Sequence, residues 1–299
     1  MNVIKKWFTP KNKTTQKFSL FDSLILTVLI LYTIALFALI IWGIFTAFKT
    51  WNNFRTDKIG FPNPIAFENI GIVWNAFYVH NGAREVMAGE MLLYTILYAF
   101  GGALLMTIAP CIVAYAVTKF DKYLYSKFLN GIVIITMIMP IVGSAPSMLQ
   151  FMHALYLYDT FLGVWLQKFN FLGLYFLTFS ATYKSLPKEF HEAASIDGAG
   201  EWQIFLKIIL PLVKNMFFTV MLIHFVEIWN DYQISILYLP SYPTLARGVF
   251  NVSNITTGVF QEVPNKMMAC MFLIIPILTL FIVFRNKLMG NLSMGGVKE

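Results

Sequence analysis

Six apolar runs dominate this sequence of 299 residues, and each one is long enough to cross a lipid bilayer. A helix needs about 20 mostly apolar residues to span the hydrocarbon core. The runs lie at approximately residues 22–48, 91–118, 131–153, 162–183, 215–238 and 267–284. Only 12% of the residues are charged, against about 25% in an average soluble domain. The chain is therefore predicted to be an all-α, polytopic membrane protein with six transmembrane helices.

The positive charges are distributed unevenly between the loops that these six spans define. The chain has 22 Lys and Arg residues, and most of them fall in the N-terminal tail, the loops after the second and fourth spans, and the C-terminal tail. Lys and Arg accumulate in the cytoplasmic loops of membrane proteins. Both termini are therefore predicted to be cytoplasmic. The net charge of +7 is interpreted as a topology signal, and no nucleic-acid partner is expected.

This topology divides the chain into tails and a membrane domain. Residues 1–21 are predicted to form a cytoplasmic N-terminal tail, and residues 285–299 a cytoplasmic C-terminal tail. Residues 22–284 are predicted to form the transmembrane domain, and its core lies at about residues 90–284.

The fourth run is the weakest because it contains Lys168 and Asn170. We expect either that its helix begins near Phe171 or that the helix tilts so that the Lys168 ammonium group reaches the membrane surface along its aliphatic stem. Cys111 and Cys270 lie in apolar runs without metal-ligand spacing, so no metal site is predicted.

The most informative segment is the predicted cytoplasmic loop at residues 184–214, which is longer than a simple connection requires. Pro187 suits the first turn of a helix, where a backbone N–H is not needed. Glu189 and Glu192 fall early in the same helix, where their negative charges interact favourably with the positive end of the helix dipole. Gly198 follows, and glycine accepts the left-handed conformation that ends many helices. The loop is therefore predicted to begin with a short helix.

A second short helix is predicted after Gly200. Its apolar residues recur at the spacing of one helical face, and Pro211 is expected to end it just before the fifth span. The residues of this predicted stripe are Trp202, Phe205, Leu206 and Ile209. The same periodicity is also compatible with an amphipathic loop that only packs against lipid headgroups.

This loop resembles the E-A-A-x3-G-x9-I-x-L-P signature of the permease subunits of ATP-binding-cassette importers, and every fixed position is present. The matching residues are Glu192, Ala193, Ala194, Gly198, Ile208, Leu210 and Pro211. Other segments resemble carbohydrate permeases, and the end of the chain is similar to the tail of the maltose-type second permease subunit. These segments lie at residues 196–199, 201–205, 229–231, 243–245 and 290–298.

The resemblance implies a type I importer permease fold in a bacterial cytoplasmic membrane. It implies a transport subunit for a sugar or oligosaccharide that is not itself an enzyme. The implied partners are a second permease in a heterodimer, an ATP-binding-cassette ATPase dimer and an extracytoplasmic solute-binding protein. ATP and Mg would bind to the ATPase, and no cofactor is expected on this chain, whose sequence contains no G-x-x-x-x-G-K-[ST] phosphate loop.

By the same resemblance, the first short helix of the loop docks on the ATPase. The carboxylate of Glu192 would meet a basic partner residue, the small Ala193 and Ala194 would allow close approach, and Gly198 would permit the turn. The expected coupling residues are Glu192, Ala193, Ala194, Asp197 and Gly198. The C-terminal tail is the second expected contact with the ATPase, through Gly295, Gly296 and Val297.

The fifth predicted span carries His224, Glu227 and Asp231 at the spacing of one helical face. Ionisable groups at membrane depth are costly and usually face the bundle interior or water. Sugar hydroxyls also need hydrogen-bond partners, so Glu227, Asn230 and Asp231 are candidates for lining the solute pathway. In the alternative interpretation, Asn230 and Asp231 only cap or bend the outer end of the helix.

Other functions remain open at this point. An importer of the same class could carry a non-sugar solute such as a polyamine, a phosphonate or an amino acid, although the segment around Trp229 resembles carbohydrate permeases. An ion-coupled secondary transporter often contains inverted repeats, and none is visible in the sequence. A membrane enzyme would need a paired catalytic constellation, which is also not visible.

Overall fold

The computed structural model describes residues 19–139 and 143–292, with side chains as far as Phe284. Most of the described chain is helical, and four of its helices are long and apolar enough to cross a membrane. They are α2 (Leu20–Ala47), α5 (Ala88–Lys119), the continuous helix Glu201–Trp229 that ends in α12 (Leu210–Trp229), and the span Val263–Phe284 within α15 (Val263–Leu292). These correspond to the first, second, fifth and sixth predicted spans.

The third and fourth predicted spans are each divided into two helices. The third run contains α6 (Leu124–Ile138) and α7 (Ala145–Ala154), and the fourth contains α8 (Phe161–Lys168) and α9 (Leu174–Lys184). Between α8 and α9, Gly173 has a φ of 134°, which only glycine adopts readily. The Asn170 side chain also accepts a hydrogen bond from the Leu172 N–H at 2.9 Å, which stabilises the turn. The prediction of one unbroken helix was wrong for the third run. In the fourth run α9 begins at Leu174, close to the alternative start predicted near Phe171.

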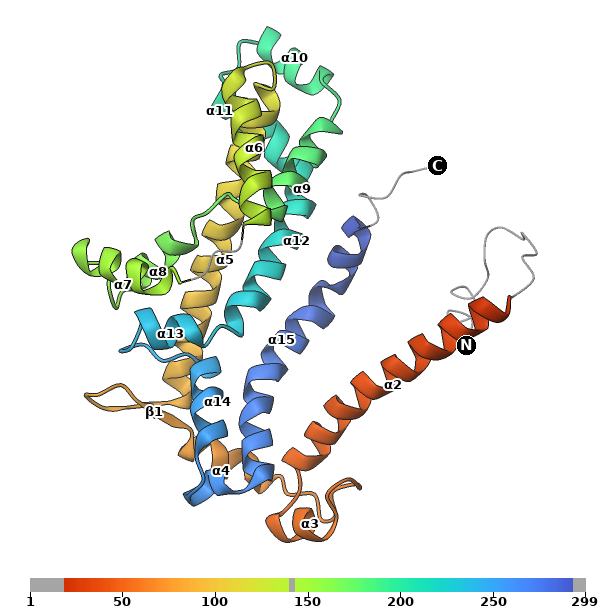
Figure 1. Ribbon diagram of the computed structural model, residues 1–299, viewed down its shortest axis with the longest axis vertical. Coiled ribbons are helices and arrows are strands. Elements are labelled where there is room, and N and C mark those ends of the chain that lie inside the picture. The colour runs from red at the N-terminus through yellow and green to blue at the C-terminus, as the bar shows by residue number, and fades with distance from the viewer. Residues whose placement is uncertain (1–18, 140–142, 293–299) are drawn as a thin grey trace.

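The segment before α5 forms a small cap at one end of the molecule (Figure 1). It contains α3 (Trp51–Thr56), α4 (Glu68–Ala76) and an antiparallel hairpin of β1 (Tyr78–His80) and β2 (Glu85–Met87), with Val79 opposite Val86. The connection after α12 returns to this end and adds three short helices. These are α13 (Gln233–Tyr238), α14 (Leu245–Asn254) and the 3₁₀ helix η2 (Gly258–Gln261).

Helix α5 runs the length of the body and packs on α12, α9 and α8. It joins two hydrophobic clusters, one near the cap and one near the opposite end. The cluster near the cap includes Phe77, Met91, Tyr98, Trp229 and Met268. The cluster at the opposite end includes Cys111, Phe176, Phe179, Ile204 and Phe205.

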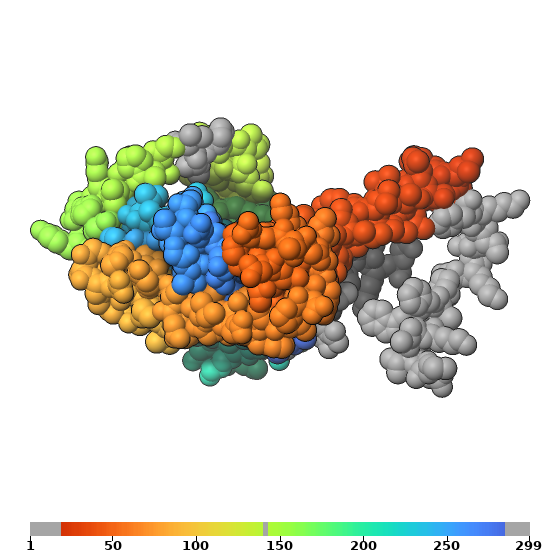
Figure 2. Space-filling model, turned by 90° about the horizontal axis from the view of Figure 1, so that it is seen from below, coloured from red at the N-terminus to blue at the C-terminus, as the bar shows by residue number. Residues whose placement is uncertain are grey.

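Helix α2 stands apart from this body. It contacts α15 near its own C-terminal end, and only Gly43, Thr46 and Ala47 are buried along its length. Figures 1 and 2 show the rest of α2 projecting away from the other helices. An apolar helix exposed in this way needs lipid or another protein around it, which agrees with a membrane environment.

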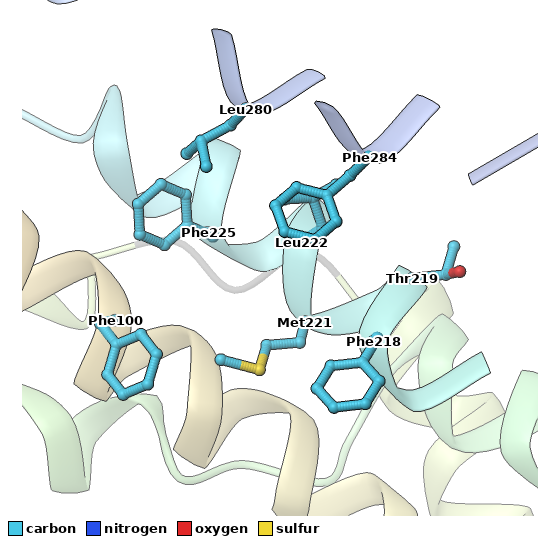
Figure 3. A pocket seen from close by; sticks show the side chains of 8 residues that line it. All are labelled: Phe100, Phe218, Thr219, Met221, Leu222, Phe225, Leu280 and Phe284. Atoms are coloured by element: carbon cyan, nitrogen blue, oxygen red, sulfur yellow. The ribbon is translucent and has the colours of Figure 1, made fainter. Parts of the chain in front are cut away.

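An open cavity of about 340 Å³ lies between α5, α12 and α15 (Figure 3). Its lining side chains are apolar apart from one threonine, and they include Phe100, Phe218, Met221, Leu222, Phe225 and Leu280. A surface with so few hydrogen-bonding groups offers little to sugar hydroxyls. The cavity therefore suits hydrocarbon, such as a lipid tail or an apolar helix, better than a polar solute.

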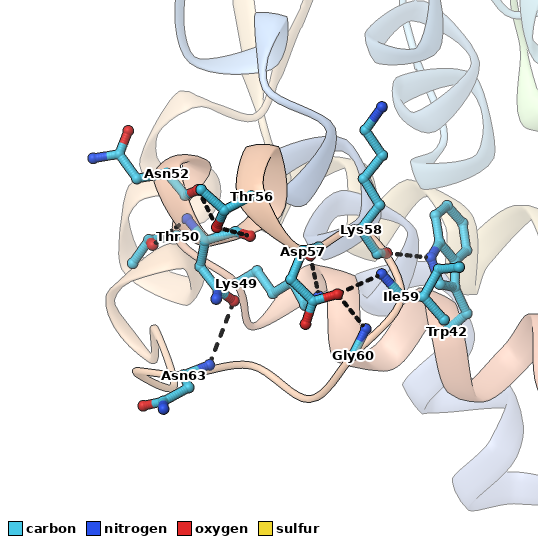
Figure 4. A network of polar contacts seen from close by, with 11 residues as sticks. Trp42, Lys49, Thr50, Asn52, Thr56, Asp57, Lys58, Ile59, Gly60 and Asn63 are labelled. Carbon is cyan, nitrogen blue, oxygen red and sulfur yellow. Dashed lines mark hydrogen bonds and ion pairs between the residues drawn. The ribbon is translucent and has the colours of Figure 1, made fainter.

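The cap is held to the end of α2 by a closely connected polar network (Figure 4). The side chain of Lys49 is fully buried, and its Nζ donates to the Asp57 carbonyl oxygen at 2.5 Å. The Asn69 side chain donates to the carbonyl oxygens of Ala47 and Lys49, both at 2.9 Å. The pKa of Asp57 is lowered chiefly by the backbone N–H groups of Gly60 and Ile59, with a smaller contribution from Lys49. The cap therefore has few unsatisfied polar groups where it meets α2.

Candidate functional site

The short helix α10 (Glu189–Ile196) lies at the end of the molecule opposite the cap (Figure 1). Gly198 follows it with a φ of 78°, and the Gly198 N–H donates to the Ser195 carbonyl oxygen at 3.1 Å. The Ala199 N–H closes the turn on the Ala194 carbonyl oxygen at 3.0 Å. The predicted first helix and its glycine-dependent end are both present. Pro187 lies just outside the helix, because Lys188 is its N-cap residue.

The expected coupling residues do not all face the same way. Glu192, Ala193, Asp197 and Gly198 are exposed, whereas Ala194 is only 7% exposed and belongs to the cluster that contains Ile204 and Phe205. Ala194 therefore packs within its own chain and is not free to contact a partner. Its small side chain instead lets α10 lie close to the helices beneath it.

Two large apolar side chains on α10 were missed by the sequence analysis. Phe190 is 46% exposed and Ile196 is 86% exposed at the tip of the molecule. Large apolar residues exposed together near a protein's tip mark interaction surfaces more often than isolated ones do. Their positions beside the E-A-A motif were visible in the sequence, but the spacing of the motif gave no reason to expect them outside.

The prediction of a separate second helix that ends at Pro211 was wrong. The helix α11 (Glu201–Ile204) continues through the π-helical segment η1 (Phe205–Ile209) directly into α12. In η1 the Leu210 N–H donates to the Phe205 carbonyl oxygen, five residues back. A π turn changes the hydrogen-bond register, and so it accommodates a proline that would otherwise break an α-helix.

The π turn also alters which residues of this helix are buried. Phe205 and Ile209 are buried, but Trp202 is 62% exposed and Leu206 is 54% exposed, so the four residues of the predicted stripe do not share one environment. Ile204, which lies outside the predicted stripe, is fully buried. The single apolar stripe was therefore wrong, because an ideal spacing of 3.6 residues per turn does not describe this helix.

A polar contact ties α5, α10 and α11 together. Glu201 forms an ion pair with Lys119 at the end of α5, and its Oε2 lies 3.4 Å from His191 Nε2 on α10. Burial lowers the pKa of His191, and the nearby charge of Lys119 lowers it further. His191 is therefore mostly neutral at neutral pH. Neither Lys119 nor His191 belonged to a motif that the sequence analysis recognised.

The candidate pathway residues near the cap are not arranged as predicted. Helix α12 ends at Trp229, so Asp231 lies beyond it and does not share its face. Asp231 Oδ1 accepts a hydrogen bond from the Ile234 N–H at 3.1 Å, in the first turn of α13. Asp231 Oδ2 lies 3.0 Å from the Tyr98 hydroxyl and 3.3 Å from Lys168 Nζ. Lys168 is therefore paired inside the protein rather than extended to the membrane surface.

The other polar residues of α12 have different surroundings. His224 is buried, with its Nδ1 at 3.0 Å from Thr107 Oγ1 and its ring against the edge of Tyr175. Asn230 is exposed, and its side chain donates to the Val226 carbonyl oxygen at 2.8 Å, as a cap would. Glu227 is exposed and makes no ion pair or hydrogen bond with any described residue. Of the predicted face, His224 and Glu227 remain on α12, and Glu227 is the exposed one of the two.

The expected contact of the tail lies outside the described residues, because Gly295, Gly296 and Val297 follow Leu292. Within the described part of the chain, no group of three His, Cys, Asp or Glu side chains could hold a metal ion.

Residues 112–292 match the family described as "Binding-protein-dependent transport system inner membrane component". The chain is 26% identical to the melibiose/raffinose/stachyose import permease protein MelC of Bacillus subtilis over 258 residues, covering 85% of this chain and 88% of the relative. It is 23% identical to the trehalose transport system permease protein SugB of Mycobacterium tuberculosis, covering 87% and 91% of the two chains. It is 29% identical over 221 residues to the sn-glycerol-3-phosphate transport system permease protein UgpE of Yersinia pestis, covering 74% and 76%.

The fold is similar to a chain of a solved bacterial ABC transporter involved in the import of the acidic polysaccharide alginate. The TM-score is 0.73 at 20% sequence identity, and the match covers 93% of this chain and 99% of the other. At this identity the likeness supports the importer permease fold.

Proposed function

Because the chain belongs to the family of binding-protein-dependent transport system inner membrane components, we propose that it is a permease subunit of an ATP-driven importer of sugars or oligosaccharides. It is a multi-pass protein of the bacterial cytoplasmic membrane. In the proposed assembly it forms half of the translocation pathway. A second permease forms the other half, an ATPase dimer drives the cycle, and an external binding protein delivers the solute.

The substrate class rests on the names of the relatives. MelC and SugB are named for the transport of oligosaccharides and trehalose. UgpE, which is named for sn-glycerol-3-phosphate, makes a small phosphorylated polyol the second candidate. Both kinds of solute carry several hydroxyl groups, and both need a pathway with hydrogen-bonding side chains.

The observation that carries the proposal is the position of α10. It stands at one end of the molecule, with Glu192, Ala193 and Asp197 exposed beside the large apolar side chains Phe190 and Ile196. A carboxylate next to apolar anchors suits a partner groove that is lined with apolar residues and carries a basic residue. Because α11 is continuous with α12, a movement that passes from α10 through the turn at residues 197–200 to α11 would reach a membrane-spanning helix with no further break.

The experiment uses the assembled transporter, reconstituted with its binding protein and solute. With Glu192→Lys we expect ATP hydrolysis to persist while solute uptake falls at least tenfold, since burying a reversed charge at an interface costs more than about 2 kcal/mol. The matched control is Lys207→Glu, which also reverses an exposed charge at this end but lies outside α10. Full uptake by Glu192→Lys would contradict the coupling role.

Glu227 supports a pathway role because a carboxylate exposed on a membrane-spanning helix must face water or a polar partner. We expect Glu227→Gln to raise the solute concentration needed for half-maximal uptake and to leave protein stability unchanged. The matched variant Asp231→Asn should instead lower stability, because Asp231 pairs with Lys168. If Glu227→Gln left the dependence of uptake on solute concentration unchanged, the proposal that Glu227 lines the pathway would be contradicted.

A further inference from the structure

The turn between α10 and α11 separates the proposed docking surface from the membrane-spanning helix. It covers residues 197–200 and contains two glycines, Gly198 and Gly200, the first of which has a φ of 78°. Glycine has the widest conformational freedom of any residue. The hydrogen bond from the Ala199 N–H to the Ala194 carbonyl oxygen closes this turn onto α10 but not onto α11. The backbone alone therefore leaves α10 able to pivot against α11.

A side-chain link spans this turn and is centred on Glu201, the first residue of α11. Its Oε2 atom forms an ion pair with Lys119 Nζ and lies 3.4 Å from His191 Nε2. Lys119 is the last residue of α5, and His191 lies on α10. Within the part of the chain that the structure describes, no other side chain of α10 forms a hydrogen bond or ion pair with another helix. One carboxylate oxygen therefore links α10, α11 and α5.

The His191 ring is held at both of its nitrogen atoms. A carboxylate only accepts hydrogen bonds, so the ring pairs with Glu201 when its Nε2 carries the proton. Burial lowers the pKa of His191, which favours the neutral ring, and Nδ1 is then an acceptor. The Ser195 Oγ lies 3.4 Å from Nδ1 and 2.9 Å from the His191 carbonyl oxygen, so its hydroxyl is shared between these two acceptors. The neutral ring therefore satisfies both contacts and points its N–H at Glu201.

A second contact fixes the rotation of α11 against α5. Tyr115 lies four residues before Lys119 on α5, and Phe205 lies four residues after Glu201. Helical residues four positions apart share a face. The rings of Tyr115 and Phe205 have their centres 4.9 Å apart. The ion pair and the ring contact are therefore successive contacts between two antiparallel helices, one turn apart, and together they oppose rotation of α11 about its own axis.

We propose that Glu201 is a positioning residue that, through Lys119 and His191, makes α10, the end of α5 and the continuous helix Glu201–Trp229 move as one unit. The inference rests on the proposed coupling role of α10 and names the residue that carries the movement across the turn. With the link in place, a displacement of α10 carries the ends of two membrane-spanning helices with it. Without the link, the glycine-containing turn bends and α10 moves alone.

The test measures distances by double electron–electron resonance in the assembled transporter, without nucleotide and trapped with ATP and vanadate. Spin-labelled amino acids replace Lys188, directly before α10, and Asn230, at the end of α12. We expect one label distance that trapping leaves unchanged. In Glu201→Gln, trapping should add a second distance, and the ratio of the second to the first should rise about threefold, the shift expected from losing a partly exposed charge pair.

Two further variants separate the link from a general loss of structure. Lys119→Glu/Glu201→Lys restores an ion pair at the same place and should restore the single distance. The matched control is Asp121→Asn, which removes an exposed carboxylate that makes no ion pair within the described residues, and it should keep the single distance. A single distance in Glu201→Gln would overturn the proposal, as would a second distance of equal weight in the unaltered transporter or in Asp121→Asn.

Photo-crosslinking from position 196 to the ATPase, in a separate sample of each protein, distinguishes this inference from the coupling role on which it rests. An adduct that persists in Glu201→Gln shows that docking is intact while the link is broken. Loss of the adduct in Glu201→Gln alone would assign Glu201 to docking and overturn the proposed link. An adduct missing from the unaltered transporter as well would contradict the coupling role of α10 itself.

Discussion

The two ends of this molecule are built differently, although α5 and α12 run between them. At the cap, Lys49 is fully buried and Asn69 donates two hydrogen bonds to neighbouring carbonyl oxygens. At the α10 end, Ile196 is 86% exposed and the Tyr115 hydroxyl has no partner in the described chain. Large apolar side chains are exposed at both ends, since Ile59 on the cap is 80% exposed. The difference lies in the buried polar side chains: Lys49 and Asn69 are paired at the cap, whereas the Tyr115 hydroxyl is buried without a partner at the α10 end.

The largest effect on stability expected from the loss of a single hydrogen bond is at the cap. Lys49→Met removes the donor to the Asp57 carbonyl oxygen and should cost about 2 kcal/mol, because hydrogen bonds from charged groups are the strong ones. The measurement is the thermal unfolding temperature of the purified protein in detergent. The control Lys58→Met removes an exposed lysine next to the same loop. Equal unfolding temperatures for the two variants would show that the cap does not depend on its buried lysine.

A smaller effect at the cap is expected from pH. The pKa of Asp57 is lower in the folded protein than in the unfolded chain, so its carboxylate contributes stability at neutral pH. That contribution is lost as the pH falls below the ordinary range of an aspartate and through the lowered pKa. The Asp57→Asn variant should be less stable at neutral pH, and the difference should shrink on acidification. A difference that stays constant between neutral and strongly acidic pH would contradict this assignment.

The smallest effect on stability is expected at the tip of α10. Ile196→Ser should change the free energy of unfolding by no more than about 0.5 kcal/mol, since the side chain makes little contact within the chain. The same variant should reduce solute uptake in the assembled transporter. Ile204→Ser, at a fully buried position in the helix that follows, is the comparison and should be markedly destabilised. If Ile196→Ser lowered the stability but left solute uptake normal, Ile196 would be a structural residue of α10 and not a contact for a partner.

The local sequence was sufficient for features that depend on local chemistry. The apolar run of α5, the short helix α10 and its glycine-dependent end were all predicted from length, charge and the conformational freedom of Gly198. What could not be predicted depends on distant partners. The burial of Ala194 and the pairing of Lys168 with Asp231 arise only when helices far apart in sequence come together.

The continuity of α11 with α12 shows a different limit. Pro211 is normally a good indication of a helix end, yet the π turn at residues 205–209 places it inside a helix. The same turn moves Ile204 into the core and Leu206 out of it. A single change of hydrogen-bond register therefore explains why periodicity predicted both the helix boundary and the buried face of the helix incorrectly. It also produces the continuous helix on which the proposed coupling depends.

The central claim is that α10 contacts the ATPase, and site-specific photo-crosslinking tests it most directly. A photoreactive amino acid replaces Ile196 in the assembled transporter, and a second sample carries it at Ile59, which is 80% exposed on the cap. The account predicts a covalent adduct with the ATPase from position 196 and none from position 59. Absence of an ATPase adduct at position 196, or an equally strong one from position 59, would contradict it.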